Sequence, residues 1–449
     1  MSRKRLTYVP VLAGVLAMLA SPPASRADSG FVAPLDEVPL TNTLATGARA
    51  VGMGFVSMAV ADDATAIMSN PAAMARLNRV ELSGGFRRGS LGVDGEMSGS
   101  EFGTDLSGTD LASLRFAYPF PTFRGSLVLG FSAERIYDFA GDRLAAYDGE
   151  IEWDEHPDDG VDGPDASGVW YNKEDYVSDG GITALSAACA LEVSPTVSLG
   201  VAFSYLVGDY SRGFVWDIYD TVDYVSETYT EVHLQERSEA DITGFRGTIG
   251  GLFYAMEGLS VGVAIDTPTA VTFDGTGWDY VRKVMPDSTT VGEWSEFFSD
   301  KVTLPFAFRA GVAYAPADFI VVGADLSYSD WSEMDYAGRI TETDESADVP
   351  QRRALYDEKV GYGVGAELTV PSWPLRIRGG YAYRPIAYNG LEVTTDRSYF
   401  TLGAGILIDT VLAIDVAWMN GTYERADDEY AYVESVDDTD LIFEATYRF

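Results

Sequence analysis

The stretch IVVGADLSYS, residues 320–329, alternates between larger apolar side chains and small or polar ones. Successive side chains of a β-strand point to opposite faces, so this period of two predicts a strand with two different faces. The stretch LRIRGGYAYR, residues 375–384, alternates in the same way. Such a pattern is typical of a membrane β-barrel with lipid outside and a polar lumen inside, although a soluble β-sandwich alternates too.

The connections between such runs separate these two classes. Tight turns, such as residues 193–195 and 315–317, alternate with long segments rich in Asp, Glu, Gly and Tyr, such as 138–179 and 275–301. Short periplasmic turns and long external loops are the layout of outer-membrane barrels. We therefore predict an all-β, transmembrane antiparallel β-barrel of about 14 strands over residues 79–449. The predicted strands are 79–88, 110–119, 124–137, 180–192, 196–208, 240–255, 258–273, 302–315, 318–331, 359–370, 373–384, 397–408, 411–421 and 440–449.

The first 27 residues have the composition of a secretory signal peptide. Three bases at residues 3–5 precede an apolar stretch at residues 9–20 and a small-residue end at Ala27. The apolar stretch is too short to span a membrane as a helix, which needs about 20 residues. Because no other segment reaches that length, a bundle of membrane helices is excluded, and we expect export to the bacterial outer membrane.

Charge and reactive residues exclude several functions. The formal net charge of −38 repels nucleic acid, and the single cysteine, Cys189, permits no internal disulfide. The two histidines, His156 and His233, have no readable catalytic partners, so we expect neither an enzyme nor a cofactor or metal site. The acidic stretch 154–165 lacks the spacing of a calcium loop. Its acids are either solvated, bridged to lipopolysaccharide through divalent ions, or part of a dedicated cation site.

Residues 28–78 show no strand alternation and are rich in small and apolar residues. Asp62 and Asp63 precede a helix-like stretch as capping residues would, and Asn70 before Pro71 should end that stretch. Fourteen strands enclose a lumen that this segment could plug, since larger barrels leave a channel. A disordered periplasmic tail is the alternative, but such tails are usually poor in apolar residues. We therefore predict an N-terminal hatch inside the barrel.

Three motifs in this segment resemble a known family. GARA at residues 47–50, ADDA at 61–64 and NPA at 70–72 are similar to the hatch of the FadL/TodX/OMPP1 outer-membrane transporters of long-chain fatty acids and other hydrophobic compounds. The likeness continues more loosely through residues 304–331 and 361–383. The resemblance implies a 14-stranded barrel with an N-terminal hatch, which agrees with the strand number obtained from the connections.

The resemblance also implies a function. It implies passive uptake of hydrophobic compounds through a ligand-gated hatch and a lateral exit, without a cofactor. A binding or shuttle protein of a secretion system, as in type IX secretion, is the alternative. The hatch or gating residues would be Gly52, Gly54, Asp62, Asp63, Asn70, Pro71 and Ala72.

Arginines on the predicted lumen face are candidates for binding an anionic head group, because arginine binds carboxylates bidentately. They are Arg309, Arg376, Arg378 and Arg384. Alternatively, they form a structural ladder with lumen acids such as Asp325 and Glu367, since buried charges need partners. The expected partners are a long-chain fatty acid or other hydrophobic molecule, outer-membrane lipid and lipopolysaccharide, and the barrel assembly machinery, which would contact the terminal Phe449.

Overall fold

Eighteen strand segments lie edge to edge in one antiparallel sheet in the computed structural model, which describes residues 40, 47–97, 99–151, 168–220, 230–285, 287–337, 355–389, 392–427 and 432–449. The segments are β1 (Glu81–Met97), β2 (Ser100–Phe120), β3 (Leu127–Asp138), β4 (Gly141–Ile151), β5 (Gly168–Ser194), β6 (Val197–Asp220), β7 (Glu231–Met256), β8 (Leu259–Asp266), β9 (Thr269–Val284), β10 (Thr289–Leu304), β11 (Ala307–Ala317), β12 (Ile320–Asp330), β13 (Asp335–Ala337), β14 (Glu358–Thr369), β15 (Leu375–Arg384), β16 (Glu392–Ile408), β17 (Leu412–Asp427) and β18 (Tyr432–Arg448).

These segments build a closed barrel of 14 strands. Four barrel strands consist of two consecutive segments each, namely β3 with β4, β8 with β9, β10 with β11, and β12 with β13. The first and last strands, β1 and β18, pair over their whole length and close the barrel. The predicted fold class, a transmembrane all-β barrel of 14 strands, is confirmed.

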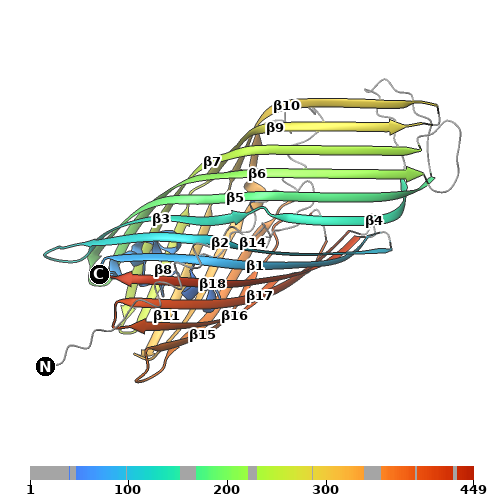
Figure 1. Cartoon of the computed structure of the whole chain (residues 1–449). Coiled ribbons are helices and arrows are strands. Elements are labelled where there is room, and N and C mark those ends of the chain that lie inside the picture. Colours follow the sequence, from blue (N-terminus) through green and yellow to red (C-terminus); the bar gives the residue numbers. More distant parts are fainter. Residues whose placement is uncertain are drawn as a thin grey trace, which may run out of the picture.

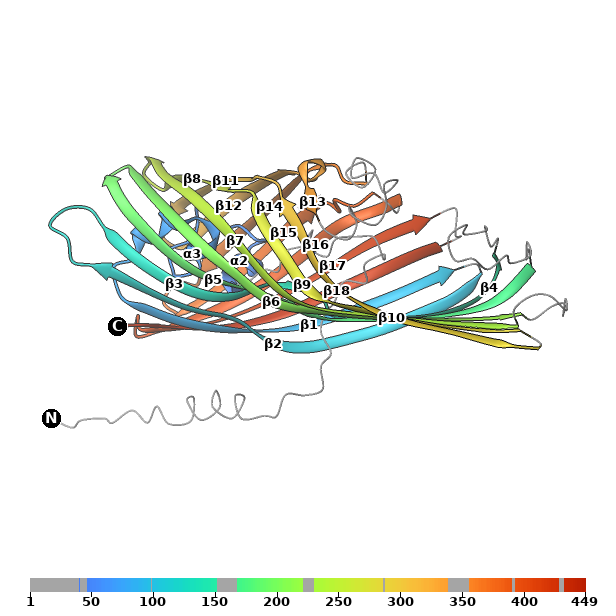
Figure 2. The same ribbon diagram turned by 90° about the horizontal axis from the view of Figure 1, so that it is seen from above.

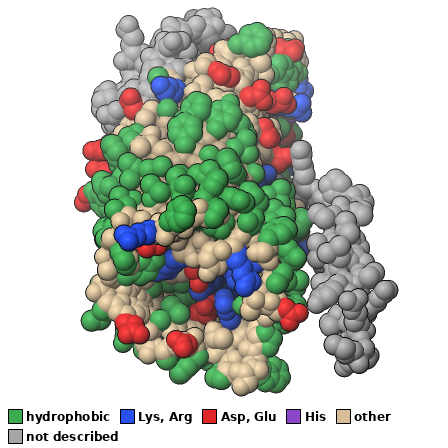
Figure 3. All heavy atoms as spheres, turned by 90° about the vertical axis from the view of Figure 1, so that its left-hand side faces the viewer, with side chains coloured by type: hydrophobic (Ala, Val, Ile, Leu, Met, Phe, Trp, Pro, Cys, Tyr) green, Lys and Arg blue, Asp and Glu red, His purple; other side chains and the backbone are tan. Residues whose placement is uncertain are grey.

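The outer wall presents apolar side chains to its surroundings. On β7, Phe245, Ile249 and Phe253 point outward and are 54%, 59% and 39% exposed, whereas Leu252 points inward and is buried. Figure 3 shows hydrophobic side chains gathered across the middle of one face, with charged side chains above and below them. A band of this kind buries its area in lipid rather than in a protein core. The protein is therefore a barrel of the bacterial outer membrane, as predicted.

The strands are longer than the alternation predicted. Residues 275–301, expected to form a loop, are mostly the hairpin of β9 and β10, and residues 138–179 contain β4 and the start of β5. Both loop assignments were wrong, because ladder hydrogen bonds continue beyond the lipid where the apolar alternation ends. The predicted signal peptide and the acidic stretch 154–165, with its His156, lie outside the described residues.

The lengthened strands project well beyond the rest of the barrel. We call this part the projecting sheet; it comprises β4, β9, most of β10, and residues 168–180, 208–220 and 231–241 of β5, β6 and β7. Its strands run side by side toward the upper right in Figure 1. Figure 2 shows the same strands almost edge-on, so the sheet is nearly flat there.

Residues 47–78, which we call the inner segment, lie within the barrel (blue in Figure 2). They contain two short helices, α2 (Ala48–Gly52) and α3 (Ala66–Ser69), and the 3₁₀ helix η1 (Pro71–Arg76); a further 3₁₀ helix, η2 (Trp331–Glu333), follows β12. Most apolar side chains of the inner segment are buried against strands of the wall. None of the helices described here is long and apolar enough to cross a membrane.

Candidate functional site

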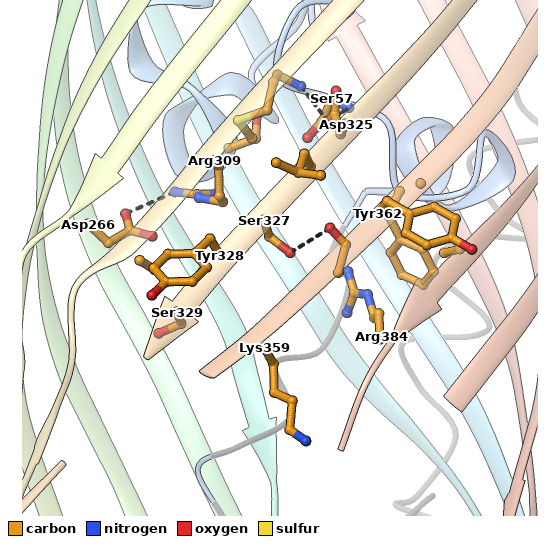
Figure 4. A pocket seen from close by; sticks show the side chains of 18 of the residues that line it. Ser57, Asp266, Arg309, Asp325, Ser327, Tyr328, Ser329, Lys359, Tyr362 and Arg384 are labelled. Carbon is orange, nitrogen blue, oxygen red and sulfur yellow. Dashed lines mark hydrogen bonds and ion pairs between the residues drawn. The ribbon is translucent and has the colours of Figure 1, made fainter. Parts of the chain in front are cut away.

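A cavity of about 380 Å³ lies between the inner segment and the wall (Figure 4). Its apolar lining comes from both sides: Phe55, Met58 and Met68 belong to the inner segment, and Leu304 and Trp331 belong to the wall. This volume falls within the range of small-molecule sites, which are mostly apolar with a few placed polar groups. The cavity can therefore hold part of a hydrophobic molecule.

The charged lining of this cavity is predominantly basic. Five bases and two acids line it, although the chain carries a net charge of −38. The bases are Arg246, Arg309, Lys359, Arg384 and Arg397, and the acids are Asp266 and Asp325. Basic side chains thus outnumber acidic ones around this cavity, whereas acidic residues outnumber basic ones in the chain as a whole, and such a lining attracts an anion.

Arg309 and Asp325 hold the wall side of the cavity. Arg309 donates to Asp266 at 2.9 Å, and Asp325 accepts from the backbone N–H groups of Ser57 at 2.6 Å and Met58 at 2.9 Å. Asp325 therefore ties the inner segment to β12. Both of these hydrogen bonds end on the same carboxylate oxygen, Oδ2.

Arg384 lies at the end of β15 and faces the cavity in Figure 4. Its guanidinium carbon lies 3.8 Å from the centre of the Phe55 ring, a cation–π contact that fixes its position. Here the apolar wall of the cavity and a positive charge meet at one point. This arrangement suits a ligand with an apolar chain and an anionic end.

The other two predicted arginines lie elsewhere. Arg378 is buried and donates to Glu367 at 2.6 Å and to Asp415 at 2.5 Å, so it belongs to a structural ladder of the kind considered above. Arg376 lies two residues nearer the start of β15 and is not among the residues that line the cavity. The structure thus brings Arg309 and Arg384 together at the cavity, but not Arg376 and Arg378. Ligand binding by any of the four stays a prediction.

The predicted hatch glycines lie where the inner segment meets the wall. Gly54 has a φ of +67°, which a glycine adopts without strain, and it donates to Thr401 Oγ1 at 2.9 Å. A side chain at Gly380 of β15 would place its Cβ 2.2 Å from the Gly54 nitrogen. A Cβ added at Gly52 would lie 3.0 Å from the Cα of Gly403 in β16. The backbones touch only because both surfaces lack side chains.

The aspartates of the inner segment do not cap its helix directly. Thr65 precedes α3, and Asp63 accepts from the Thr65 backbone N–H at 3.0 Å, so the predicted capping positions were two residues too early. Asp62 instead forms an ion pair with Arg49. Arg49 also donates to both oxygens of Glu367, at 2.9 and 3.0 Å. Burial alone would lower the pKa of Arg49, but Asp62 and Glu367 raise it well above its ordinary value.

Asn70 ends α3, as predicted, and starts η1. It is fully buried; its amide nitrogen donates to the carbonyl groups of Met58 at 2.8 Å and Gly251 at 3.1 Å, and its oxygen accepts from the Ala72 N–H at 3.2 Å. Pro71 and Ala72 are buried beside it, against glycines of β6 and β7. The Asn70-Pro71-Ala72 motif therefore joins two parts of the inner segment to the wall.

Several cavity residues were missed by the sequence reasoning. Phe55, Lys359 and Arg397 come from three distant stretches, and only the folded chain brings them together. One local signal existed: Pro268 and Pro305 interrupt the ladder between β8 and β9 and between β10 and β11. Proline cannot donate to a ladder, so a proline inside a strand pattern marks an irregularity in the wall.

No protein-family model and no curated protein matches this chain. Solved structures do match. A Pseudomonas aeruginosa FadL homologue is 14% identical to this chain, and the similarity covers 94% of this chain and 100% of that one, with a TM-score of 0.62. The chain has the FadL fold. The P. putida toluene transporter TodX shows the same similarity at 13% identity, over 89% and 97% of the two chains, with a TM-score of 0.60. The Ralstonia pickettii toluene transporter TbuX is 16% identical, with 92% of this chain and 100% of that chain covered, and has a TM-score of 0.55. At such identities the likeness concerns the FadL fold alone.

Proposed function

We propose that this barrel takes up hydrophobic compounds passively, and that its ligands carry an acidic head group, as long-chain fatty acids do. The supporting observation is the cavity, in which an apolar lining meets five bases in a strongly acidic chain. Neutral hydrocarbons need no such bases. Proteins of the same fold are described as toluene transporters and monoaromatic hydrocarbon channels, so hydrophobic cargo fits this architecture.

In this proposal the head group binds near Arg384 and Arg309 while the acyl chain lies against Phe55, Met58 and Met68. A carboxylate at Arg384 would receive charge-assisted hydrogen bonds, which contribute about 1.5–3 kcal/mol each. Removing that charge should weaken binding of oleate by about tenfold or more, since about 1.4 kcal/mol is a factor of ten. Binding of toluene, which has no charge, should change little.

The test compares Arg384→Gln with Arg376→Gln, a control in the same strand that lies away from the cavity. Uptake of radiolabelled oleate is measured in cells lacking the gene and complemented with each variant. The proposal predicts slow uptake without the gene and with Arg384→Gln, and normal uptake with Arg376→Gln. Uptake unaffected by gene deletion, together with purified protein free of acyl chains, would refute transport. Co-purifying secretion proteins would instead favour the shuttle alternative.

The inner segment is proposed to act as the hatch, because it lies inside the barrel and its residues form one side of the cavity. Movement of this segment would have to release the Asp325 contacts to Ser57 and Met58, which also line the cavity. Ligand binding and release of the segment would thus be coupled. Deletion of residues 70–72 should change oleate uptake while the barrel still assembles, and unchanged uptake would exclude the hatch role.

A lateral exit is proposed between β14 and β15. Within the described residues, their ladder begins at Tyr362 and Tyr383, so residues 358–361 of β14 pair with β12 only. Pro385, which follows β15, has no N–H to extend the ladder. Tyr362, Tyr383 and Pro385 all line the cavity. A fatty acid carrying a diazirine in its chain should label Tyr362 or Tyr383 more than Tyr447, and equal labelling would argue against this exit.

A further inference from the structure

The outward face of the projecting sheet carries a pattern that the proposed transport does not use. Four cross-strand rows run over β5, β6, β7 and β9 on this face. The rows are Tyr171, Tyr219, Glu231 and Val284; Lys173, Asp217, His233 and Arg282; Asp175, Val215, Gln235 and Tyr280; and Val177, Gly213, Arg237 and Trp278. Rings and hydrogen-bonding side chains fill most positions.

The rings of these rows form two groups. Tyr171 and Tyr219 lie with their centres 6.3 Å apart. Tyr280 lies 5.9 Å from His233 and 6.0 Å from Trp278, and its ring is nearly parallel to that of Trp278, at 12°. We call these five residues the aromatic platform. The strand and residue spacings of a sheet give the four rows an area of roughly 14 by 20 Å.

Polar groups of both kinds surround the aromatic platform. Asp217 bonds to His233, Glu231 pairs with Arg282, and the guanidinium of Arg237 lies 6.0 Å from the Trp278 ring. Lys173 is exposed at the edge of the aromatic platform. Donors and acceptors therefore alternate across a flat surface that also offers ring faces.

This combination fits a saccharide. The C–H groups on one side of a pyranose carry small positive partial charges and are attracted to the negative face of an aromatic ring. The hydroxyl groups around the edge of the pyranose both donate and accept hydrogen bonds, so they need neighbours of both kinds. The core of a protein–protein interface is instead depleted of Lys, Asp and Glu, whereas Lys173, Asp217 and Glu231 occupy positions within these rows.

The position of the aromatic platform indicates which saccharide it meets. On β7 the lipid-facing band ends at Phe245, and Arg237 lies eight residues earlier in the chain on the same outward face, about 27 Å along the strand. The platform thus continues the lipid-facing surface into the layer above the lipid. We propose that the aromatic platform binds the core saccharide of the lipopolysaccharide that surrounds the barrel.

A matched control exists on the same hairpin. Trp294 of β10 is 52% exposed and pairs with Asp279, the neighbour of Trp278 in β9. Successive residues of a strand point to opposite faces, so Trp294 lies on the other face of the sheet from Trp278. Replacing Trp294 removes an exposed indole from the projecting sheet without touching the aromatic platform.

The experiment uses the full-length protein in detergent micelles and lipid-free, dephosphorylated core oligosaccharide as the probe, with binding followed by calorimetry. The double variant Trp278→Ala, Tyr280→Ala should lower affinity about tenfold or more, because each ring contributes stacking as well as buried area. Trp294→Ala should bind normally. Absence of binding by the unchanged protein, an equal loss in Trp294→Ala, or binding of phosphorylated lipid A only would overturn the proposal.

This inference is independent of the transported compound. Oleate uptake by cells should be normal for the double variant, since the aromatic platform lies outside the barrel lumen. Loss of saccharide binding with normal uptake supports the platform whatever the cavity carries. Circular dichroism and heat-modifiable migration on gels establish that both variants form the barrel.

Discussion

Replacement of Asn70 by alanine should loosen the inner segment while leaving the barrel wall intact. The Asn70 side chain is completely buried and makes three hydrogen bonds, two donated to the carbonyl groups of Met58 and Gly251 and one accepted from the Ala72 N–H. Alanine leaves all three backbone groups without this partner. Each such loss costs about 1–3 kcal/mol, and some of these groups will recover water as the segment relaxes.

We therefore expect the free energy that holds the inner segment in place to fall by about 2–4 kcal/mol. Opening would become about thirty- to several-hundred-fold more frequent, since about 1.4 kcal/mol is a factor of ten. Amide hydrogen exchange read by mass spectrometry measures this quantity for the peptide containing residues 48–76. Exchange there should accelerate by that factor, whereas exchange in β1 and β18 should not change.

Asn420→Ala is the control, because Asn420 bonds to Thr439 within the wall, at 2.8 Å, and does not contact the inner segment. It should leave exchange of residues 48–76 unaltered. Unchanged exchange in Asn70→Ala would refute the reasoning, as it would show that the three hydrogen bonds do not hold the segment. Accelerated exchange throughout the wall would also refute it, by showing that the segment and the barrel unfold as one unit.

Three further substitutions test the contacts of the inner segment and the wall. Arg49→Met removes two hydrogen bonds to Glu367, which keeps Arg378 as a partner, so protection of residues 48–76 from hydrogen exchange should fall by about 1.5–3 kcal/mol; unchanged protection would contradict this. Gly54→Val places a Cβ 2.6 Å from a carbonyl oxygen of β14 and should displace the segment, seen as faster tryptic cleavage after Arg49; cleavage at the unmodified rate would contradict this. Arg115→Met leaves the buried Glu444 unpaired by arginine and should lower the unfolding temperature of the whole barrel; an unchanged temperature would show that the pair adds no stability.

Some of the site could be predicted because it depends on local pattern. The alternation around residues 320–329 assigns Asp325 to the lumen face, and the residues of β15 follow the same rule, so the candidate arginines could be named from the sequence. The partners of these arginines could not be predicted from the sequence. Arg378 and Arg384 lie on one face of β15, but one is buried between two acids and the other lines the cavity, and this difference depends on height in the barrel and on neighbouring strands.

The sequence by itself determined that the chain is a 14-stranded outer-membrane barrel. The two-residue period of the side chains and the alternation of tight turns with long connections can both be read along the chain without knowledge of its tertiary contacts. The stretch at residues 320–329 and its repeats contain this information, and the Asn70-Pro71-Ala72 motif marked the inner segment. Only the tertiary structure decided how far the strands continue beyond the lipid, since backbone ladders need no particular side chains. It also decided which charges face one another, because Phe55, Arg309 and Arg384 meet only when distant strands close around the inner segment.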